Sequence, residues 1–298
     1  MSYKYAPVVL FVYNRPNHTA KTIEHLKNNN LADKTDLFIF SDAAKSDKQT
    51  DKVKLVREYI GTISGFKSVT ICEAEKNRGL AKSIISGVSD VLNKYGVVIV
   101  LEDDIITAPC FLEYMNSALT FYKDDKEIWS ITGYNYPFEI PNSYKETVYL
   151  SYRASSWSWA TWKDRWDTVD WDIKDYAAYR WNPIKIAQFC KGGTDLDKML
   201  RNQMKGLIDS WAIRWCYNQS FQKKYTIYPC SAIATNIGTD GTGTHFSENS
   251  SRYNSRLDEN YKYEFKHHLQ IDPEIMRRYR KIVNRSIIRR IKRILRVK

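Results

Sequence analysis

The chain has 298 residues, is 43% hydrophobic and is poor in glycine and proline, so it can form a packed core and is neither disordered nor fibrous. Its net charge of +12 is concentrated near one end: residues 277–298 hold eleven lysines and arginines and no acid, which leaves 35 of the 46 basic residues against 34 acidic residues elsewhere. This distribution argues against a protein that binds nucleic acid over its whole surface.

The cysteines form no recognisable framework, because there are five of them and no Cys-x-x-Cys pair or metal-type spacing occurs. We therefore expect reduced thiols in a cytoplasmic protein. Residues 1–5 lead into an apolar segment without the composition of a signal peptide, and no apolar run approaches the roughly 20 residues of a membrane span.

The first half of the chain alternates between strand and helix patterns. Strands are expected over residues 7–13, 36–41, 68–72 and 97–101. Helices are expected after Pro16 and over residues 48–63, 80–95 and 109–122, the last opening on Pro109 because proline suits a first helical turn. This order predicts an α/β fold with a mainly parallel sheet and right-handed connections.

The pattern changes after about residue 128. A further strand is expected over residues 128–132, and residues 157–181 hold six of the nine tryptophans. The second half therefore reads as an elaboration on the first half rather than as a separate domain.

The most informative stretch is the strand at residues 97–101, which runs into Glu102, Asp103 and Asp104. Three adjacent carboxylates repel one another, and a buried unpaired charge is costly. A divalent cation removes that conflict and can also hold the diphosphate of a nucleotide. Ligands of open α/β sheets bind at the carboxyl ends of strands, so the motif predicts a metal–nucleotide site.

Four segments together resemble the GT-A class of nucleotide-sugar glycosyltransferases: LFVYNRP, FIFSDA, NRGLAKSI and VLEDDIITAPCFLEYM. The last segment is especially similar to the inverting N-acetylglucosaminyltransferases that act on mannose of N-glycans, and it also fits family-2-like bacterial transferases. The resemblance covers roughly residues 6–250. It implies a GT-A, Rossmann-like fold. Together with the change of pattern after residue 128 and the basic end of the chain, it predicts a nucleotide-sugar-binding half over residues 1–128, an acceptor-binding half of the same domain over 129–265 and a basic tail over 266–298.

The resemblance also implies roles for the acids and for nearby polar residues. Asp104 would bind Mn²⁺ or Mg²⁺, while Asp103 and Glu102 would hydrogen-bond the donor sugar or ribose. The remaining donor-binding candidates follow two other strands or precede a helix: Arg15, Asp42, Asn77, Arg78 and Gly79. An acidic turn before a helix and a surface arginine are the structural alternatives for these residues.

Inversion of the anomeric centre requires a general base that takes the proton of the acceptor hydroxyl. In the resembled family this base is an aspartate in a tryptophan-containing segment, and Asp209 occupies the comparable place. The family's pair of aspartates is reduced here to Asp209 and Ser210. Asp164, Asp195 and Asp197 are competing candidates, and a helix-capping role is the alternative for Asp209.

The segment 235–245 is the most glycine-dense part of the chain and resembles the loop that closes over the nucleotide sugar in these enzymes. His245 would then contact the diphosphate or the metal. Trp157 and Trp159, two residues apart, are expected either to line a sugar pocket or to pack in the core.

Residues 282–298 have helical spacing, with isoleucines on one face and basic residues mostly on the other. This pattern is typical of a helix lying on an anionic membrane surface, and a solvated terminal helix is the alternative. With the basic residues of 277–298, it predicts a protein bound peripherally to the inner face of the cell membrane.

The sequence thus predicts a metal-dependent, inverting glycosyltransferase that moves a sugar, preferably from a UDP-sugar, to a hydroxyl of a glycan. A lipid-linked saccharide of bacterial surface polysaccharide synthesis is the expected acceptor, and nucleic acid is not an expected partner. The alternatives are a sugar-nucleotide nucleotidyltransferase, disfavoured because FVYNRPNHT lacks glycine, and a non-catalytic membrane-associated glycan-binding protein.

Overall fold

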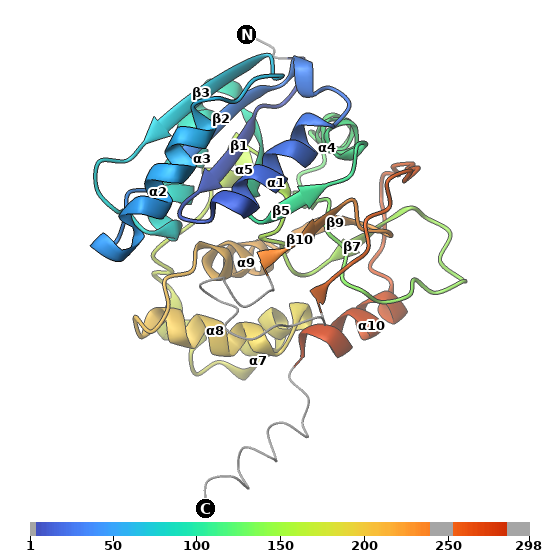
Figure 1. Cartoon of the computed structure of the whole chain (residues 1–298). Helices are drawn as coiled ribbons and strands as arrows, with labels where there is room; N and C mark the ends of the chain where they lie inside the picture. Colours follow the sequence, from blue (N-terminus) through green and yellow to red (C-terminus); the bar gives the residue numbers. More distant parts are fainter. Residues whose placement is uncertain (1–3, 239–252, 285–298) are drawn as a thin grey trace, which may run out of the picture.

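The structure, a computed structural model, describes residues 4–238 and 253–284 (Figure 1). Its strands are β1 (Val8–Val12), β2 (Asp36–Ser41), β3 (Ser68–Glu73), β4 (Val97–Glu102), β5 (Ile105–Thr107), β6 (Ile128–Thr132), β7 (Val148–Ser151), β8 (Trp159–Trp162), β9 (Tyr225–Pro229) and β10 (Ala234–Asn236). Its α-helices are α1 (Pro16–Lys27), α2 (Asp47–Ile60), α3 (Leu80–Tyr95), α4 (Phe111–Phe121), α5 (Lys163–Trp166), α6 (Tyr176–Tyr179), α7 (Pro183–Phe189), α8 (Asp195–Met204), α9 (Trp211–Phe221) and α10 (Pro273–Val283). Two short 3₁₀ helices, η1 (Ala32–Lys34) and η2 (Cys190–Gly192), complete the described elements.

Eight strands form one mixed sheet in the order β3-β2-β1-β4-β8-β6-β9-β7. The four strands from β3 to β4 are parallel, β8 is antiparallel to its neighbours β4 and β6, and β5 pairs with β10 in a separate small sheet. The predicted α/β class with a mostly parallel central sheet is confirmed. The chain moves outward from β1 to β3 and then returns to place β4 on the other side of β1, which makes a topological switch point between β1 and β4.

Helices cover both faces of the sheet, and the strand pattern explains why. Alternate residues of β1 enter opposite cores: Val8 and Leu10 pack with α1, α2 and α4, whereas Val9 and Phe11 pack with α3 and, further along the sheet, α8 and α9. Strand β4 is buried on both faces, as its run of β-branched residues predicted.

The elements predicted in the first half are found, with one difference at a helix start. Helix α4 begins at Phe111, with Cys110 as its N-cap, so Pro109 lies just before the helix and not in its first turn. The short strands β5, β7, β8, β9 and β10 were not predicted. They are three to five residues long, and three of them pair antiparallel in the second half of the large sheet.

Helix α10, at the end of the described chain, packs against the large sheet. The buried face of α10, formed by Ile275, Met276, Tyr279 and Val283, contacts Tyr149 and Tyr228 of β7 and β9. Residues 277–283 of the basic segment therefore belong to a docked helix, whereas 285–298 lie outside the described residues. Among the described helices, none combines the length and the apolar composition needed to cross a bilayer.

Candidate active site

The candidate site lies at the switch point between β1 and β4. The two strands are adjacent and parallel, with Phe11 opposite Glu102, so their carboxyl ends reach the same edge of the sheet. Arg15 follows β1 by three residues, and Asp103 and Asp104 follow β4 directly. The fold therefore brings these predicted residues together, although 88 positions separate Arg15 from Asp103 along the chain.

Arg15 bridges the two aspartates through a single nitrogen. Its Nη2 donates to Oδ1 of Asp103 and, at 2.9 Å, to Oδ2 of Asp104. The other oxygens, Oδ2 of Asp103 and Oδ1 of Asp104, are buried and have no hydrogen-bond partner among the described residues. One guanidinium thus leaves two carboxylate oxygens unsatisfied, a costly arrangement unless a ligand completes it.

The protonation of the cluster reflects the same imbalance. Burial, together with the charges of Asp104 and Asp103, raises the pKa of Glu102 to about 8, and Arg15 opposes the shift. Burial also raises the pKa of Asp103 to about 6, with Arg15 opposing the shift and Asp104 adding to it. Removing a carboxylate from water and placing it beside other acids both disfavour the charged form, so the cluster is an environment that a cation would stabilise.

A close backbone approach at Gly238 closes one side of this cluster. Strand β10 pairs with β5, the N–H of Ile237 donates to the carbonyl of Asp104 at 2.8 Å, and Gly238 follows directly. A Cβ atom at position 238 would clash with Oδ2 of Asp104 and lie 2.8 Å from Nη1 of Arg15. Gly238 therefore stands where no side chain fits. The sequence marked this segment as glycine-dense, but the contact depends on the β5–β10 pairing, which was not predicted.

Asp42 and the loop 77–79 also come together, but chiefly with each other. The Asp42 carboxylate accepts hydrogen bonds from the backbone N–H groups of Arg78 and Gly79, both at 2.9 Å, and from the Asn77 amide at 3.1 Å. Gly79 has φ +77° and ψ 156°, a conformation that glycine readily adopts, and serves as the N-cap of α3. Asp42 thus fixes the start of α3 at the same edge of the sheet.

The tryptophans divide between core and site edge. Trp159 is buried and packs on Trp166, Trp211 and Trp215, so the core-packing alternative holds for it. Trp157 is only half-buried and contacts the rings of Tyr134 and Tyr253. Because Trp159 pairs antiparallel with Val100, the residues just before Trp159 lie toward the carboxyl end of β4, the end that leads into the acidic cluster.

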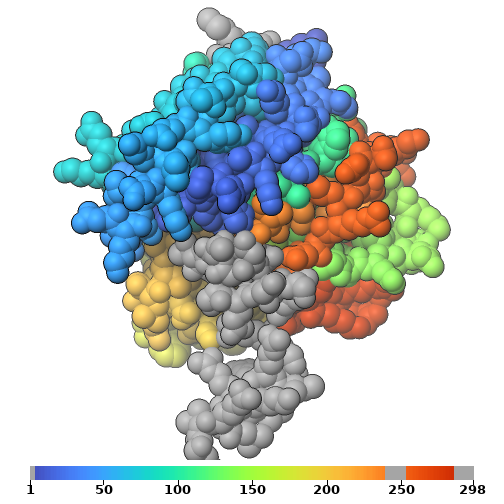
Figure 2. Space-filling model, in the orientation of Figure 1, coloured from blue at the N-terminus to red at the C-terminus, as the bar shows by residue number. Residues whose placement is uncertain are grey.

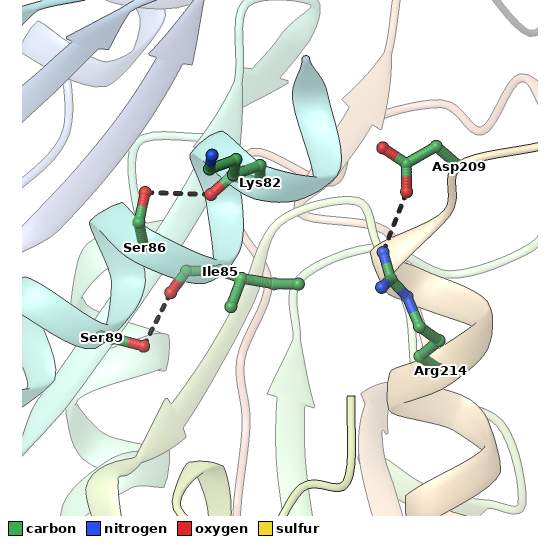
Figure 3. Close-up of a pocket in the computed structure, with 6 residues that line it drawn as sticks. All are labelled: Lys82, Ile85, Ser86, Ser89, Asp209 and Arg214. Carbon is green, nitrogen blue, oxygen red and sulfur yellow. Dashed lines mark hydrogen bonds and ion pairs between the residues drawn. The ribbon is translucent and has the colours of Figure 1, made fainter. Parts of the chain in front are cut away.

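Asp209 lies in a pocket of about 310 Å³ between α3 and α9 (Figure 3). One side is formed by Asp209 and Arg214, and the other by α3 residues that include Lys82 and Ser86. Arg214 donates to Oδ1 of Asp209 at 3.0 Å, and the Asp209 side chain is 66% exposed. The helix N-cap is Ser210, whose side chain accepts from Ile213, so the capping alternative belongs to Ser210 and not to Asp209.

No described hydrogen bond or ion pair joins Asp209 to the Arg15 cluster, but α3 connects the Asp209 pocket to the loop 77–79 that Asp42 holds. Lys82 is three residues beyond Gly79, which Asp42 holds. The competing aspartates are engaged elsewhere among the described residues: Asp164 pairs with Lys126 and Arg165, Asp195 with Arg153, and Asp197 with Arg201.

Two predicted features cannot be placed. His245 lies outside the described residues, as does most of the predicted closing loop. Within the described ranges, no group of three or more histidine, cysteine, aspartate or glutamate side chains is arranged to hold a metal alone.

Comparisons with known proteins place the chain in a family. Curated proteins gave no match. Among solved structures, TarS from S. aureus shares 15% identity at a TM-score of 0.32, over 50% of this chain and 26% of TarS. The mannosyltransferase PcManGT from Pyrobaculum calidifontis, solved with GDP-Man and Mn²⁺, shares 13% identity at a TM-score of 0.40, over 74% of this chain and 75% of that protein. At these TM-scores neither structure is evidence for the function of this chain. The sequence model of the GNT-I family matches residues 2–174, more than half of the chain, and the protein therefore belongs to the GNT-I family of glycosyltransferases.

Proposed function

We propose that this protein is a metal-dependent, inverting glycosyltransferase that moves a sugar from a nucleotide sugar, with a UDP-sugar favoured, to a hydroxyl of a glycan. The observation that carries the proposal is the pair of buried carboxylate oxygens on Asp103 and Asp104, which lie beside Arg15 at the switch point and have no hydrogen-bond partner among the described residues. Such a site calls for a ligand that combines positive charge near the carboxylates with negative charge near the guanidinium. A divalent cation bound to a nucleoside diphosphate has both.

The residues present fit Mn²⁺ or Mg²⁺. Asp104 would be the protein ligand, and its Oδ1 has no partner among the described residues. Mg²⁺ is commonly held by one or two carboxylates together with substrate phosphates, which agrees with the lack of a three-residue cluster in the described ranges. When bound, the cation would supply charge stabilisation to the departing nucleoside diphosphate.

The remaining donor contacts come from the chain itself. Arg15 would turn from the aspartates toward the donor phosphates, for which its planar guanidinium is suited. Glu102 and Asp103 would accept hydrogen bonds from hydroxyls of the sugar or ribose. Asp42 and the loop 77–79 would border the base and ribose, and Asp42 contributes there mainly by holding the N–H groups of Arg78 and Gly79 in place.

Asp209 is the proposed general base. Arg214 donates to Oδ1, and Oδ2 makes no hydrogen bond within the described residues, so one oxygen orients the carboxylate and the other remains for a proton. The proton of the acceptor hydroxyl would pass to Asp209 as the hydroxyl oxygen attacks the anomeric carbon and the bond to the nucleoside diphosphate breaks. Attack from the face opposite the leaving group inverts the centre.

For the acceptor we infer a lipid-linked saccharide at the cytoplasmic face of the cell membrane. Support comes from the eleven basic residues of 277–298, which would attract anionic lipids. The half-buried Trp157 beside the site offers an indole for stacking against a sugar ring.

The proposal is tested with a donor panel. The purified full-length protein is incubated with UDP-, GDP-, CMP- and dTDP-sugars, with and without Mn²⁺, and binding and slow donor hydrolysis are measured. We expect metal-dependent binding of one donor class, with the UDP-sugars first. Absence of metal-dependent recognition of every donor would reject the proposal, and synthesis of a nucleotide sugar from a nucleoside triphosphate would favour a nucleotidyltransferase.

A further inference from the structure

The most exposed large apolar side chains of the described residues lie in one layer of the fold. Trp181 is 75%, Ile184 is 78% and Leu207 is 68% exposed, whereas the next, Leu55, is 51% exposed. All three lie at or beside α7 and α8, which form the lower edge of the molecule in Figure 1. Large apolar side chains that gather in one layer of a surface are a sign of a contact site.

Hydrogen bonds place two of these side chains at the same end of α8. Arg201, in the last turn of α8, donates to the carbonyl of Arg180 at 3.1 Å, and Trp181 is the next residue. The N–H of Leu207 donates to the carbonyl of Asn202 at 2.9 Å. Ile184 is in the first turn of α7, three residues after Trp181. We call Trp181, Ile184 and Leu207 the apolar edge.

The surroundings of the apolar edge are basic. Residues 174–207 contain seven lysines and arginines and three aspartates, a net charge of +4. Each aspartate is already paired: Asp175 with Lys185, Asp195 with Arg153 and Asp197 with Arg201. Arg180 lies over the Trp181 ring at 4.6 Å. Positive charge next to exposed tryptophan and isoleucine is the composition of surfaces that rest on anionic lipid.

The basic C-terminal segment starts from the same layer. Asn284, the last described residue, accepts hydrogen bonds from the N–H and hydroxyl of Thr194 at 2.8 and 3.2 Å, and Thr194 is the N-cap of α8. Seven further basic residues follow between 285 and 298. The chain thus enters its most basic stretch at one end of α8, while the apolar edge lies at the other end.

We propose that the α7–α8 layer is a second membrane-contact surface, in which the apolar edge inserts among the headgroups of anionic lipids while the flanking lysines and arginines bind their charges. A helix pair that contacts the bilayer along its length has a fixed orientation on it, which attachment at a single point does not give. The surface would thereby hold the molecule in one orientation above the membrane. This inference extends the proposal of a lipid-linked acceptor, and its biological role rests on that proposed function. The lipid contact itself can be measured independently of any transfer activity.

The test uses the full-length protein and vesicles of phosphatidylcholine with or without 30% phosphatidylglycerol. We expect sedimentation with the anionic vesicles, and about a tenfold lower partition coefficient for the double variant Trp181→Ser/Ile184→Ser. Leu55→Ser is the matched control, because Leu55 is the next most exposed large apolar residue and lies on α2, in the other half of the molecule. It should bind vesicles as the wild type does.

A second readout reports the depth of the contact. Brominated lipids should quench a fluorescence component that is present in the wild type and missing in Trp181→Phe. Equal vesicle binding by wild type and double variant, or no quenching of Trp181 in vesicle-bound protein, would overturn the proposal and leave the basic segment as the sole anchor. Self-association that the double variant abolishes would instead assign the apolar edge to a second copy of the chain. Donor hydrolysis, measured without vesicles, should be the same in all variants, so failure of the proposed function shows separately.

Discussion

The two halves of the molecule place their polar residues by different means. In the parallel half, Arg15, Asp42 and the Glu102–Asp104 acids lie at or just after the end of a strand, and the strand order brings them to one edge. In the second half, Asp209 lies in a pocket made by the packing of α9 on α3. Figure 2 shows the same division, with the blue and cyan surface of the first hundred residues above and the ochre and red surface of later elements below. The proposed donor site thus depends on topology, whereas the proposed acceptor site depends on packing.

The largest expected effect of a single substitution is at Asp104, in the first half of the molecule. Asp104→Asn keeps the shape but removes the charge that would hold the cation, so we expect transfer to fall about 10³-fold and metal-dependent donor binding to be lost. Calorimetric titration of the donor with and without Mn²⁺ measures this. Because the acids repel one another, the thermal midpoint of the metal-free variant should not fall; retained metal-dependent binding would show that Asp104 is not the ligand.

Asp209 tests the other half. We expect Asp209→Asn to lower kcat by about 10²–10³-fold and to leave the donor dissociation constant unchanged, because a general base acts on the acceptor proton only. Single-turnover kinetics and donor titration separate the two effects. Asp164→Asn is the matched control, since Asp164 is half-exposed and paired with Lys126 and Arg165. Normal transfer by Asp209→Asn would assign the base to another residue.

Gly238 connects the two halves, because it belongs to the second half but lies against Asp104 and Arg15 of the first half. A methyl group at this position would clash with Asp104 and Arg15, so Gly238→Ala should weaken donor binding about tenfold. Gly61→Ala is the control, since position 61 has a helical φ of −64° and only ordinary contacts. Donor titration measures the dissociation constant of both variants. Equal donor affinities for Gly238→Ala and Gly61→Ala would mean that residue 238 moves away when the donor binds.

The smallest expected effect is a pH dependence of stability. The Glu102 carboxyl titrates near 4.5 when unfolded and near 8 in the metal-free fold, so between these values the folded state keeps a proton that the unfolded state has lost. The free energy of unfolding should therefore fall as the pH rises through this window. Glu102→Gln should remove a penalty of about 2 kcal/mol at pH 8 and change little at pH 4.5. Urea unfolding at both pH values measures it, and parallel profiles for variant and wild type would contradict the raised pKa.

The parallel half could be predicted because its signals are local. Apolar runs that end in polar residues predicted β2 and β4, and the repeating order of strand and helix predicted which strand ends meet. The second half could not be predicted in the same way. Strands such as β5 and β10 have three residues each, and their pairing depends on contacts between segments more than 120 positions apart.

Individual site residues show the same limit. The sequence placed Asp42 and the loop 77–79 near a donor, but not the hydrogen bonds that tie them together across 36 positions. The spacing of Trp157 and Trp159 is compatible with a sugar pocket or with core packing. In the structure Trp159 is buried in the core, whereas Trp157 is only half-buried. A side chain's partner is set by the whole fold, and the local pattern sets only its direction.

Helix α3 has a mechanical consequence. Its first residue follows the loop that Asp42 holds, and within its first three turns Lys82, Ser86 and Ser89 line the pocket of Asp209. A helix of 16 residues is a rod about 24 Å long, which transmits a displacement at one end with little bending. A shift of the loop 77–79 by a nucleotide would tilt this rod and carry one wall of the Asp209 pocket with it. The enzyme would in that way sense an occupied donor position before it aligns its base.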